Sequence, residues 1–192
     1  PDLLRGVCKV GQKAHLRNLK VLLERGAEAV FDSWFQCGPS VGWTPKVYEQ
    51  VFLPLIAESV ELTHRYDAVY IHQDDGKQAD IIPHLVEIGV DVLGGLQPPE
   101  VGDVVLSDVK KQYGARVCLY GGLDPCYTFE VGTEDDKDGS SLRASFATRA
   151  ALDAAMEGGA YVVGTGEAVS PKVAEEALLA VAETVKKYGS YR

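Results

Sequence analysis

Tyr70-Ile71-His72-Gln73-Asp74-Asp75-Gly76 ends a short apolar strand, expected at residues 68–71, and begins a polar loop. Alternate side chains of a strand share a face, so His72 and Asp74 are expected to point together toward the mouth of the sheet. Gln73 and Asp75 are then expected to point away. An imidazole and a carboxylate in this arrangement could bind a metal ion or exchange protons. The alternative interpretation is a polar strand end satisfied by water and backbone.

The apolar pattern along the chain alternates between short strand-like runs and longer helix-like runs, which is typical of βα units. Strands are expected at residues 29–32, 68–71, 90–93, 116–120 and 160–163. Helices are expected at residues 3–25, 48–65, 79–88, 101–113, 142–156 and 171–188. The strands are nearly continuous apolar runs, as in parallel sheets that are covered on both faces. The sequence therefore predicts the α/β class.

Polar residues and glycines follow every expected strand. They occupy residues 32–34, 72–74, 94–95, 121–125 and 164–167. The carboxyl ends of parallel strands meet on one rim of a barrel, where barrel enzymes place their active sites. The alternative is an open dinucleotide-binding sheet, but no Gly-x-Gly-x-x-Gly follows a strand and opens a helix. We therefore expect about five βα units from the C-terminal part of a TIM-type (β/α)8 barrel.

Size and charge narrow the possible functions. The chain has 192 residues, of which 46% are hydrophobic and 24% charged, enough for a single domain over residues 1–192. Its formal net charge of −9 argues against nucleic acid or an anionic membrane as a partner. The four cysteines form no Cys-x-x-Cys pair, and no apolar run is long enough for a membrane span. We expect a cytoplasmic protein with reduced thiols.

Several motifs, taken in order, resemble the uroporphyrinogen decarboxylase superfamily, which also contains the corrinoid and thiol methyltransferases. They are Phe31-Asp32-Ser33-Trp34, His72-x-Asp74 with Gly76, Tyr120-Gly121-Gly122-Leu123-Asp124-Pro125, Gly132-Thr133, Gly158-Gly159-Ala160-Tyr161 and Tyr188-Gly189-Ser190-Tyr191. The resemblance runs through nearly the whole chain but covers only the C-terminal portion of a typical member. It implies an eight-stranded barrel in which roughly three βα units and an N-terminal arm have no counterpart here.

The resemblance to the methyltransferases implies a metal site at His72, Asp74 and Glu167. In that branch the ligands are a His-x-Cys pair at a strand end and a cysteine in the last glycine-rich loop, and these residues fall on those positions. Carboxylates replace both thiolates, which keeps the charge of the ligand set and favours oxygen-binding metals or a more Lewis-acidic zinc. The expected cofactor is zinc or another divalent metal. The alternative is that the metal is lost and the carboxylates remain as hydrogen-bonding groups.

The decarboxylase branch instead holds a polycarboxylated tetrapyrrole and has no metal. Ser33 falls on the serine of that branch, whereas Glu167 falls on its late-loop histidine. The expected strand-end loops contain Lys77 and Lys137 but no arginine, so they match a polyanionic substrate poorly. This pattern disfavours the decarboxylase interpretation but does not exclude it.

We therefore predict a metal-assisted methyltransferase that moves a methyl group between a small methylated compound or thiol and a corrinoid carried by a partner protein. Asp32, Ser33 and Asp124 are the candidate catalytic or substrate-positioning residues, although Asp124 before Pro125 could simply shape its turn. The alternatives are a uroporphyrinogen-type decarboxylase and a non-catalytic barrel subunit. Five strands cannot close a barrel, so we expect a homo-oligomer or a complementing N-terminal segment.

Overall fold

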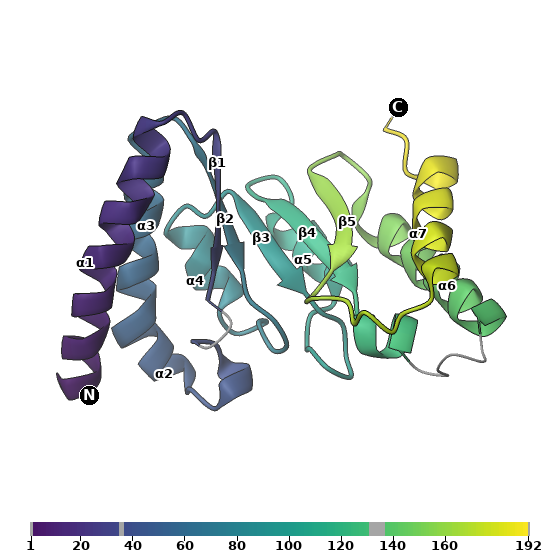
Figure 1. The fold of residues 1–192 in the computed structure, drawn as a ribbon, viewed down its shortest axis with the longest axis horizontal. Coiled ribbons are helices and arrows are strands. Elements are labelled where there is room, and N and C mark those ends of the chain that lie inside the picture. Colours follow the sequence, from purple (N-terminus) through teal and green to yellow (C-terminus); the bar gives the residue numbers. More distant parts are fainter. Residues whose placement is uncertain (1, 35–36, 131–136, 192) are drawn as a thin grey trace.

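The computed structural model describes residues 2–34, 37–130 and 137–191, and within them the chain forms one parallel sheet of five strands (Figure 1). The strands lie in chain order, β1-β2-β3-β4-β5. Their bounds are Ala29–Ser33 for β1, Val69–Gln73 for β2, Val92–Leu96 for β3, Cys118–Leu123 for β4 and Tyr161–Thr165 for β5. Helical segments connect successive strands, so the predicted α/β class is confirmed.

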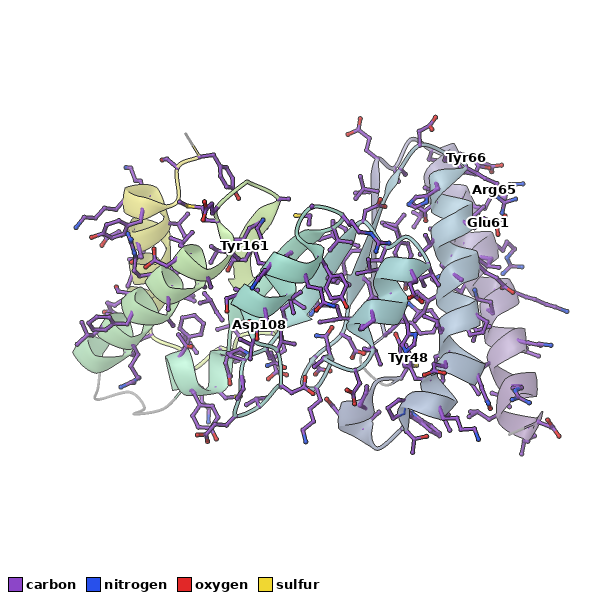
Figure 2. All side chains as sticks on the ribbon, turned by 180° about the vertical axis from the view of Figure 1, so that it is seen from behind. Tyr48, Glu61, Arg65, Tyr66, Asp108 and Tyr161 are labelled. Atoms are coloured by element: carbon purple, nitrogen blue, oxygen red, sulfur yellow. The ribbon has the colours of Figure 1, made fainter. Side chains whose placement is uncertain are left out.

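The helices differ in length and lie beside or behind the sheet. The longer ones are α1 (Asp2–Glu24), α3 (Leu53–His64), α6 (Lys137–Ala155) and α7 (Glu175–Tyr188), and the shorter segments are η1 (Pro39–Val41), α2 (Pro45–Val47), η2 (Tyr48–Phe52), α4 (Ile82–Glu87), α5 (Leu106–Tyr113) and η3 (Cys126–Glu130). Figure 1 shows α1 and α3 beyond the β1 edge and α6 and α7 beyond the β5 edge. Figure 2, drawn from behind, shows α4 and α5 lying over the sheet. Across the described ranges, no helix combines the length and apolar character needed to cross a membrane.

The helices cover one face of the sheet, and the opposite face, here called the open face, has no layer over it in the described part of the chain. In β2, Tyr70 and His72 are completely buried toward the helices, whereas Val69 is 41% exposed. Phe31 of β1 and Val162 of β5 are 58% and 50% exposed. The expectation that the strands are covered on both faces is therefore not met by the residues that the structure describes.

Two apolar clusters hold the helices on the sheet. The larger one lies between β2 to β5 and their helices, and it includes the fully buried Leu93, Leu119 and Leu85. A smaller cluster, with Leu19 of α1 and Val30 of β1, attaches the first helix to the edge strand. Burying one such side chain contributes about 1.5–3 kcal/mol, so these contacts dominate the stability of the fold.

Side-chain and proline chemistry moves several helix ends away from the predicted bounds. Asp103 Oδ1 accepts hydrogen bonds from the backbone N–H groups of Gln78 (2.8 Å) and Ala79 (2.9 Å), which holds both residues ahead of α4. Helix α4 begins later than predicted, with Pro83 in its first turn. The helix predicted at residues 48–65 begins as the π-helical η2, and Pro54 at the start of α3 has no N–H to donate.

Candidate functional site

A pocket of about 490 Å³ opens on the open face of the sheet, at the C-terminal ends of the strands. Its described lining comes from β1, β2, β4, β5 and the loops that follow β2 and β5. The lining residues are Phe31, Ser33, Gln73, Asp75, Tyr120, Thr165, Glu167 and Ala168. Parallel strands bring their carboxyl ends to one edge, which gathers residues that are far apart in the sequence. The volume suits a small molecule.

Two glycines make room for the ring of Tyr120 in this pocket. A Cβ atom at Gly94 of β3 would lie 3.1 Å from Cδ1 of the ring, and a Cβ atom at Gly164 of β5 would overlap the ring at Cε2. A larger residue at either position would have to displace the ring. The glycines therefore allow a flat aromatic surface to lie across two neighbouring strands.

Gln73 connects β2 to the loop after β5. Its Nε2 donates a hydrogen bond to the carbonyl oxygen of Gly166 at 2.8 Å and approaches that of Asp74 at 3.3 Å. Its Oε1 is buried and has no hydrogen-bond partner among the described residues. A Cβ atom at Gly94 would lie 2.5 Å from this Oε1, so the amide oxygen is packed against β3 and the side chain fixes β2 to the loop after β5.

The pocket carries two carboxylates and lacks a basic residue in its described lining. Asp75 comes from the loop after β2, and burial raises its pKa. Glu167 comes from the loop after β5, and its Oε1 lies 3.7 Å from the thiol sulfur of Cys126, which donates to it. None of the described residues that line the pocket is Lys, Arg or His. The local field therefore favours a neutral or cationic ligand over an anionic one.

His72 and Asp74 share a face, as predicted, but that face points toward the helices and not toward the mouth of the barrel. His72 is completely buried, and neither ring nitrogen has a partner in the described part of the chain. Burial lowers the pKa of His72 to about 4, against the opposing attraction of Asp32. Gln73 and Asp75 line the pocket instead, so the predicted orientation of this strand end is wrong.

Asp74 is also shielded from water. Its Oδ1 accepts a hydrogen bond from the backbone N–H of Asp75 at 2.9 Å, while its Oδ2 has no partner within the described residues. A Cβ atom at Gly38 would lie 2.5 Å from that Oδ2, so the loop after β1 passes directly over the carboxyl group. Burial raises the pKa of Asp74 to about 7, which outweighs the opposing hydrogen bond.

The predicted metal ligands do not come together in this structure. Glu167 lines the pocket on the open face, whereas His72 is buried toward the helices and Asp74 is buried beneath the loop after β1. Across the described ranges, no group of three His, Cys, Asp or Glu residues is arranged to hold a metal ion. The donor set therefore does not fit the metal site that the resemblance implied, and we derive no chemical step through it.

The three predicted catalytic residues lie in different surroundings. Ser33 lines the pocket, but Asp32 does not. The hydroxyl of Tyr70 in β2 donates a hydrogen bond to Asp32 Oδ2 at 2.6 Å, and Nε2 of His15 in α1 lies 3.2 Å from the same oxygen. Burial raises the pKa of Asp32, but these neighbours outweigh that effect and leave it below its usual value. Asp124 Oδ1 accepts a hydrogen bond from the backbone N–H of Cys126 at 2.8 Å, as expected of a residue that shapes a turn.

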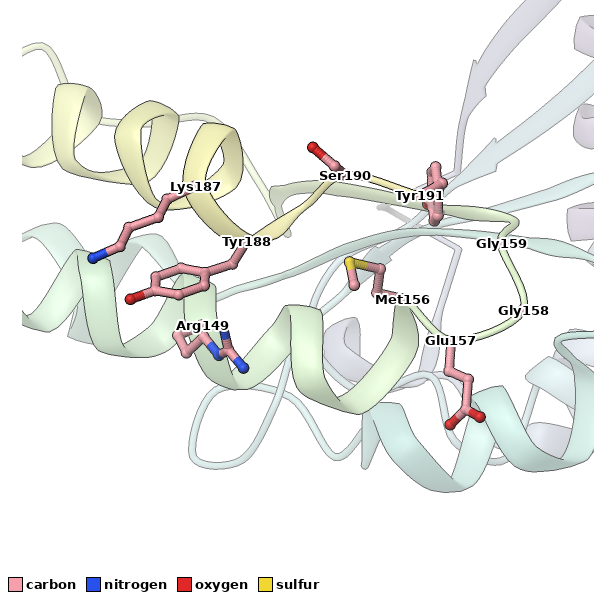
Figure 3. A pocket seen from close by; sticks show the side chains of 9 residues that line it. All are labelled: Arg149, Met156, Glu157, Gly158, Gly159, Lys187, Tyr188, Ser190 and Tyr191. Atoms are coloured by element: carbon pink, nitrogen blue, oxygen red, sulfur yellow. The ribbon is translucent and has the colours of Figure 1, made fainter.

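A larger cavity of about 740 Å³ lies at the opposite end of β5, beside the C-terminal residues (Figure 3). It contains two basic side chains, but both lie over the ring of Tyr188, with Arg149 at 4.2 Å and Lys187 at 4.9 Å from its centroid. Arg149 also forms an ion pair with Asp153 at 2.8 Å. These cations are already engaged, and barrel chemistry lies at the other ends of the strands.

The predicted site residues include two that line the pocket, Ser33 and Glu167. They miss the other six described lining residues, namely Phe31, Gln73, Asp75, Tyr120, Thr165 and Ala168. The alternation of side chains puts residues 73 and 75 on one face, but residues 72 and 74 are equally polar, so alternation alone does not show which pair lines the pocket. Tyr120 had a local signal, since two glycines follow it directly in the sequence.

Comparison with known proteins agrees with the fold. The family model described as Uroporphyrinogen decarboxylase (URO-D) matches residues 1–188. No curated protein matches the chain. The match covers nearly the whole chain, and the five βα units are those of a TIM-type α/β barrel. The chain therefore belongs to the uroporphyrinogen decarboxylase family of barrel enzymes.

Proposed function

We propose that this chain forms the substrate-binding part of a methyl-transfer enzyme, whose pocket on the open face holds a small methylated compound or thiol. The observation that carries this proposal is the charge of the pocket, since Asp75 and Glu167 line it and none of its described lining residues is basic. The tetrapyrrole decarboxylase is the second candidate within the same family.

The charge of the pocket discriminates between these two reactions. A polycarboxylated tetrapyrrole needs basic side chains that pair with its carboxylates, and unpaired anions brought close together repel one another. Asp75 and Glu167 would increase that repulsion. A methyl donor or acceptor without anionic groups meets no such penalty, and the net charge of −9 further disfavours a polyanion.

The pocket residues can perform the tasks that methyl transfer requires. The nucleophile must attack the methyl carbon in line with the bond that breaks, so positioning supplies much of the rate. The hydroxyl groups of Ser33, Thr165 and Tyr120 are available to orient the substrate. Asp75, with its raised pKa, is placed to exchange a proton with the heteroatom that gains or loses the methyl group.

The methyl carrier in this proposal is a corrinoid bound to a partner protein. The pocket volume of about 490 Å³ suits a small substrate, so the larger corrinoid would approach from the mouth of the barrel on its own protein. The exposed Phe31, Val69 and Val162 support a further proposal, that another copy or an N-terminal segment covers the open face. A single species at the mass of one chain in sedimentation would argue against that covering.

The test is to incubate the protein with methylcobalamin and a thiol and to follow the corrinoid spectrum, with uroporphyrinogen and carbon dioxide release as the parallel assay. We expect demethylation of the corrinoid and no decarboxylation. Ser33→Ala and Asp75→Asn should each lower the methyl-transfer rate. Decarboxylation without methyl transfer would overturn the proposal.

Elemental analysis of the same sample addresses the metal. If zinc or another divalent metal is present at one per chain and Glu167→Gln removes it, the predicted His72, Asp74 and Glu167 site forms in the working enzyme. If Glu167→Gln leaves the metal content unchanged, Glu167 is not a ligand.

A further inference from the structure

We propose that the pocket on the open face recognises a small cationic N-methylated amine, with Asp75 and Glu167 as its counter-charges and Phe31 and Tyr120 as its aromatic walls. This inference rests on the proposed function and names the substrate class for it. It follows from three separate properties of the pocket, which are its hydrogen-bonding capacity, its charge and its aromatic surface.

The oriented polar groups of the pocket are acceptors. Gln73 directs both amide hydrogens toward backbone carbonyl groups, so it offers no donor to a ligand. Ionised Asp75 and Glu167 can only accept hydrogen bonds. A ligand that satisfies these groups must therefore donate hydrogen bonds, as a protonated amine does and as a carboxylate or an ether does not.

The two carboxylates have no counter-charge of their own. No ion pair of Asp75 or Glu167 with Lys, Arg or His occurs among the described residues, and the thiol of Cys126 is the only side-chain donor that the described contacts give to Glu167. Bringing two carboxylates into one partly enclosed pocket costs free energy that a cation between them recovers. A ligand with one positive charge is thus favoured by the same feature that excludes a polycarboxylate.

The aromatic walls suit the methyl groups of such a cation. Phe31 of β1 is one of the residues that line the pocket, so its side chain borders the space a ligand would occupy. The ring of Tyr120 lies in the space that Gly94 and Gly164 leave free. Methylated ammonium groups bind to aromatic faces because the positive charge, spread over the methyl groups, is attracted to the ring quadrupole.

The experiment compares trimethylammonium with tert-butanol, which has a similar shape and no charge, by saturation-transfer NMR and by titration calorimetry. We expect trimethylammonium to bind at least about tenfold more tightly than tert-butanol, and to bind more weakly as salt is added. Asp75→Asn and Glu167→Gln should each weaken binding about five- to tenfold, because each removes one counter-charge. Glu157→Gln, which removes an exposed carboxylate at the other end of β5, is the matched control and should leave binding unchanged.

Two outcomes would overturn the inference. One is equal binding of tert-butanol and trimethylammonium, and the other is the same loss in Glu157→Gln as in Asp75→Asn and Glu167→Gln. The methyl-transfer assay separates this result from the proposed function. Selective amine binding without methyl transfer to a corrinoid would support the amine site and contradict the proposed reaction. Methyl transfer from a neutral donor without amine binding would support the proposed reaction and contradict the amine site.

Discussion

Replacing Asp74 by asparagine should make the stability of the protein strongly dependent on pH, because it leaves the buried His72 unopposed. His72 has its pKa lowered from 6.5 to about 4, and Asp74 has its pKa raised from 3.8 to about 7, in both cases mainly by burial. Folding therefore favours loss of the His72 proton and retention of the Asp74 proton, over nearly the same pH range.

The two effects have opposite signs. The folded protein binds the His72 proton more weakly than the unfolded chain does. The contribution of His72 to the unfolding free energy is therefore present above pH 6.5 and is lost as the pH falls toward 4. The folded protein binds the Asp74 proton more tightly than the unfolded chain does. The contribution of Asp74 to the unfolding free energy is therefore present below pH 3.8 and is lost as the pH rises toward 7. At about 1.4 kcal/mol per pKa unit, the first effect amounts to about 3 kcal/mol and the second to about 4 kcal/mol.

These magnitudes give contrasting profiles for the two single variants. In the wild type the two contributions nearly cancel between pH 4 and pH 7. Relative to the wild type, Asp74→Asn should lose about 4 kcal/mol of unfolding free energy as the pH is lowered from 7 to 4, because the stabilising uptake of a proton by Asp74 is absent. His72→Gln should gain about 3 kcal/mol relative to the wild type over the same range.

The assay is urea denaturation at half-unit steps of pH, in a buffer that contains a chelator, with the variant curve subtracted from that of the wild type. Subtraction removes the contributions of all other titrating groups that the substitution leaves unchanged. Asp108→Asn, which removes an exposed carboxylate from α5, serves as the control and should give a flat difference. A flat difference for Asp74→Asn as well would mean that Asp74 reaches water, and the reasoning would be wrong.

Three further substitutions test the packing around the site. Tyr70→Phe removes the hydroxyl that donates to Asp32 and accepts from Trp34, which should cost about 1–3 kcal/mol in urea denaturation, since a partly buried carboxylate and an indole N–H each lose a partner. Gly164→Ala places a Cβ atom against the ring of Tyr120, so it should weaken trimethylammonium binding in calorimetry while the far-UV circular dichroism stays unchanged. Leu93→Ala opens a cavity in the core and should lower the unfolding free energy by about 2–5 kcal/mol.

The order and type of the main elements could be predicted because they follow from the apolar period. All five predicted strands overlap an observed strand, and the helices predicted at 3–25, 142–156 and 171–188 overlap α1, α6 and α7. The strands continue past their apolar runs, as β4 does through Leu123, because pairing with Thr165 of β5 continues into the polar rim. Helix ends set by distant side chains, such as Asp103 ahead of α4, leave no local signal in the sequence.

The direction of the site residues could not be predicted in the same way. In a parallel strand both faces are apolar, so Val69 and Tyr70 do not show which face meets the helices. The alternation of side chains correctly paired His72 with Asp74 and Gln73 with Asp75. Which pair faces the pocket depends on how the helices pack, and that is a property of the tertiary structure.

Substitutions of the neighbouring carboxylates of Asp74 and Asp75 best distinguish the metal-site hypothesis from the proposed amine pocket. If the metal hypothesis holds, Asp74→Asn should remove the metal and the activity, and Asp75→Asn should be mild. The structure predicts the reverse for function, because Asp75 lines the pocket whereas Asp74 is 1% exposed beneath the loop after β1. We therefore expect Asp75→Asn to weaken trimethylammonium binding about five- to tenfold and Asp74→Asn to leave it unchanged while altering the pH dependence of stability. Equal losses of binding in both variants would show that the strand end is oriented differently in the working enzyme.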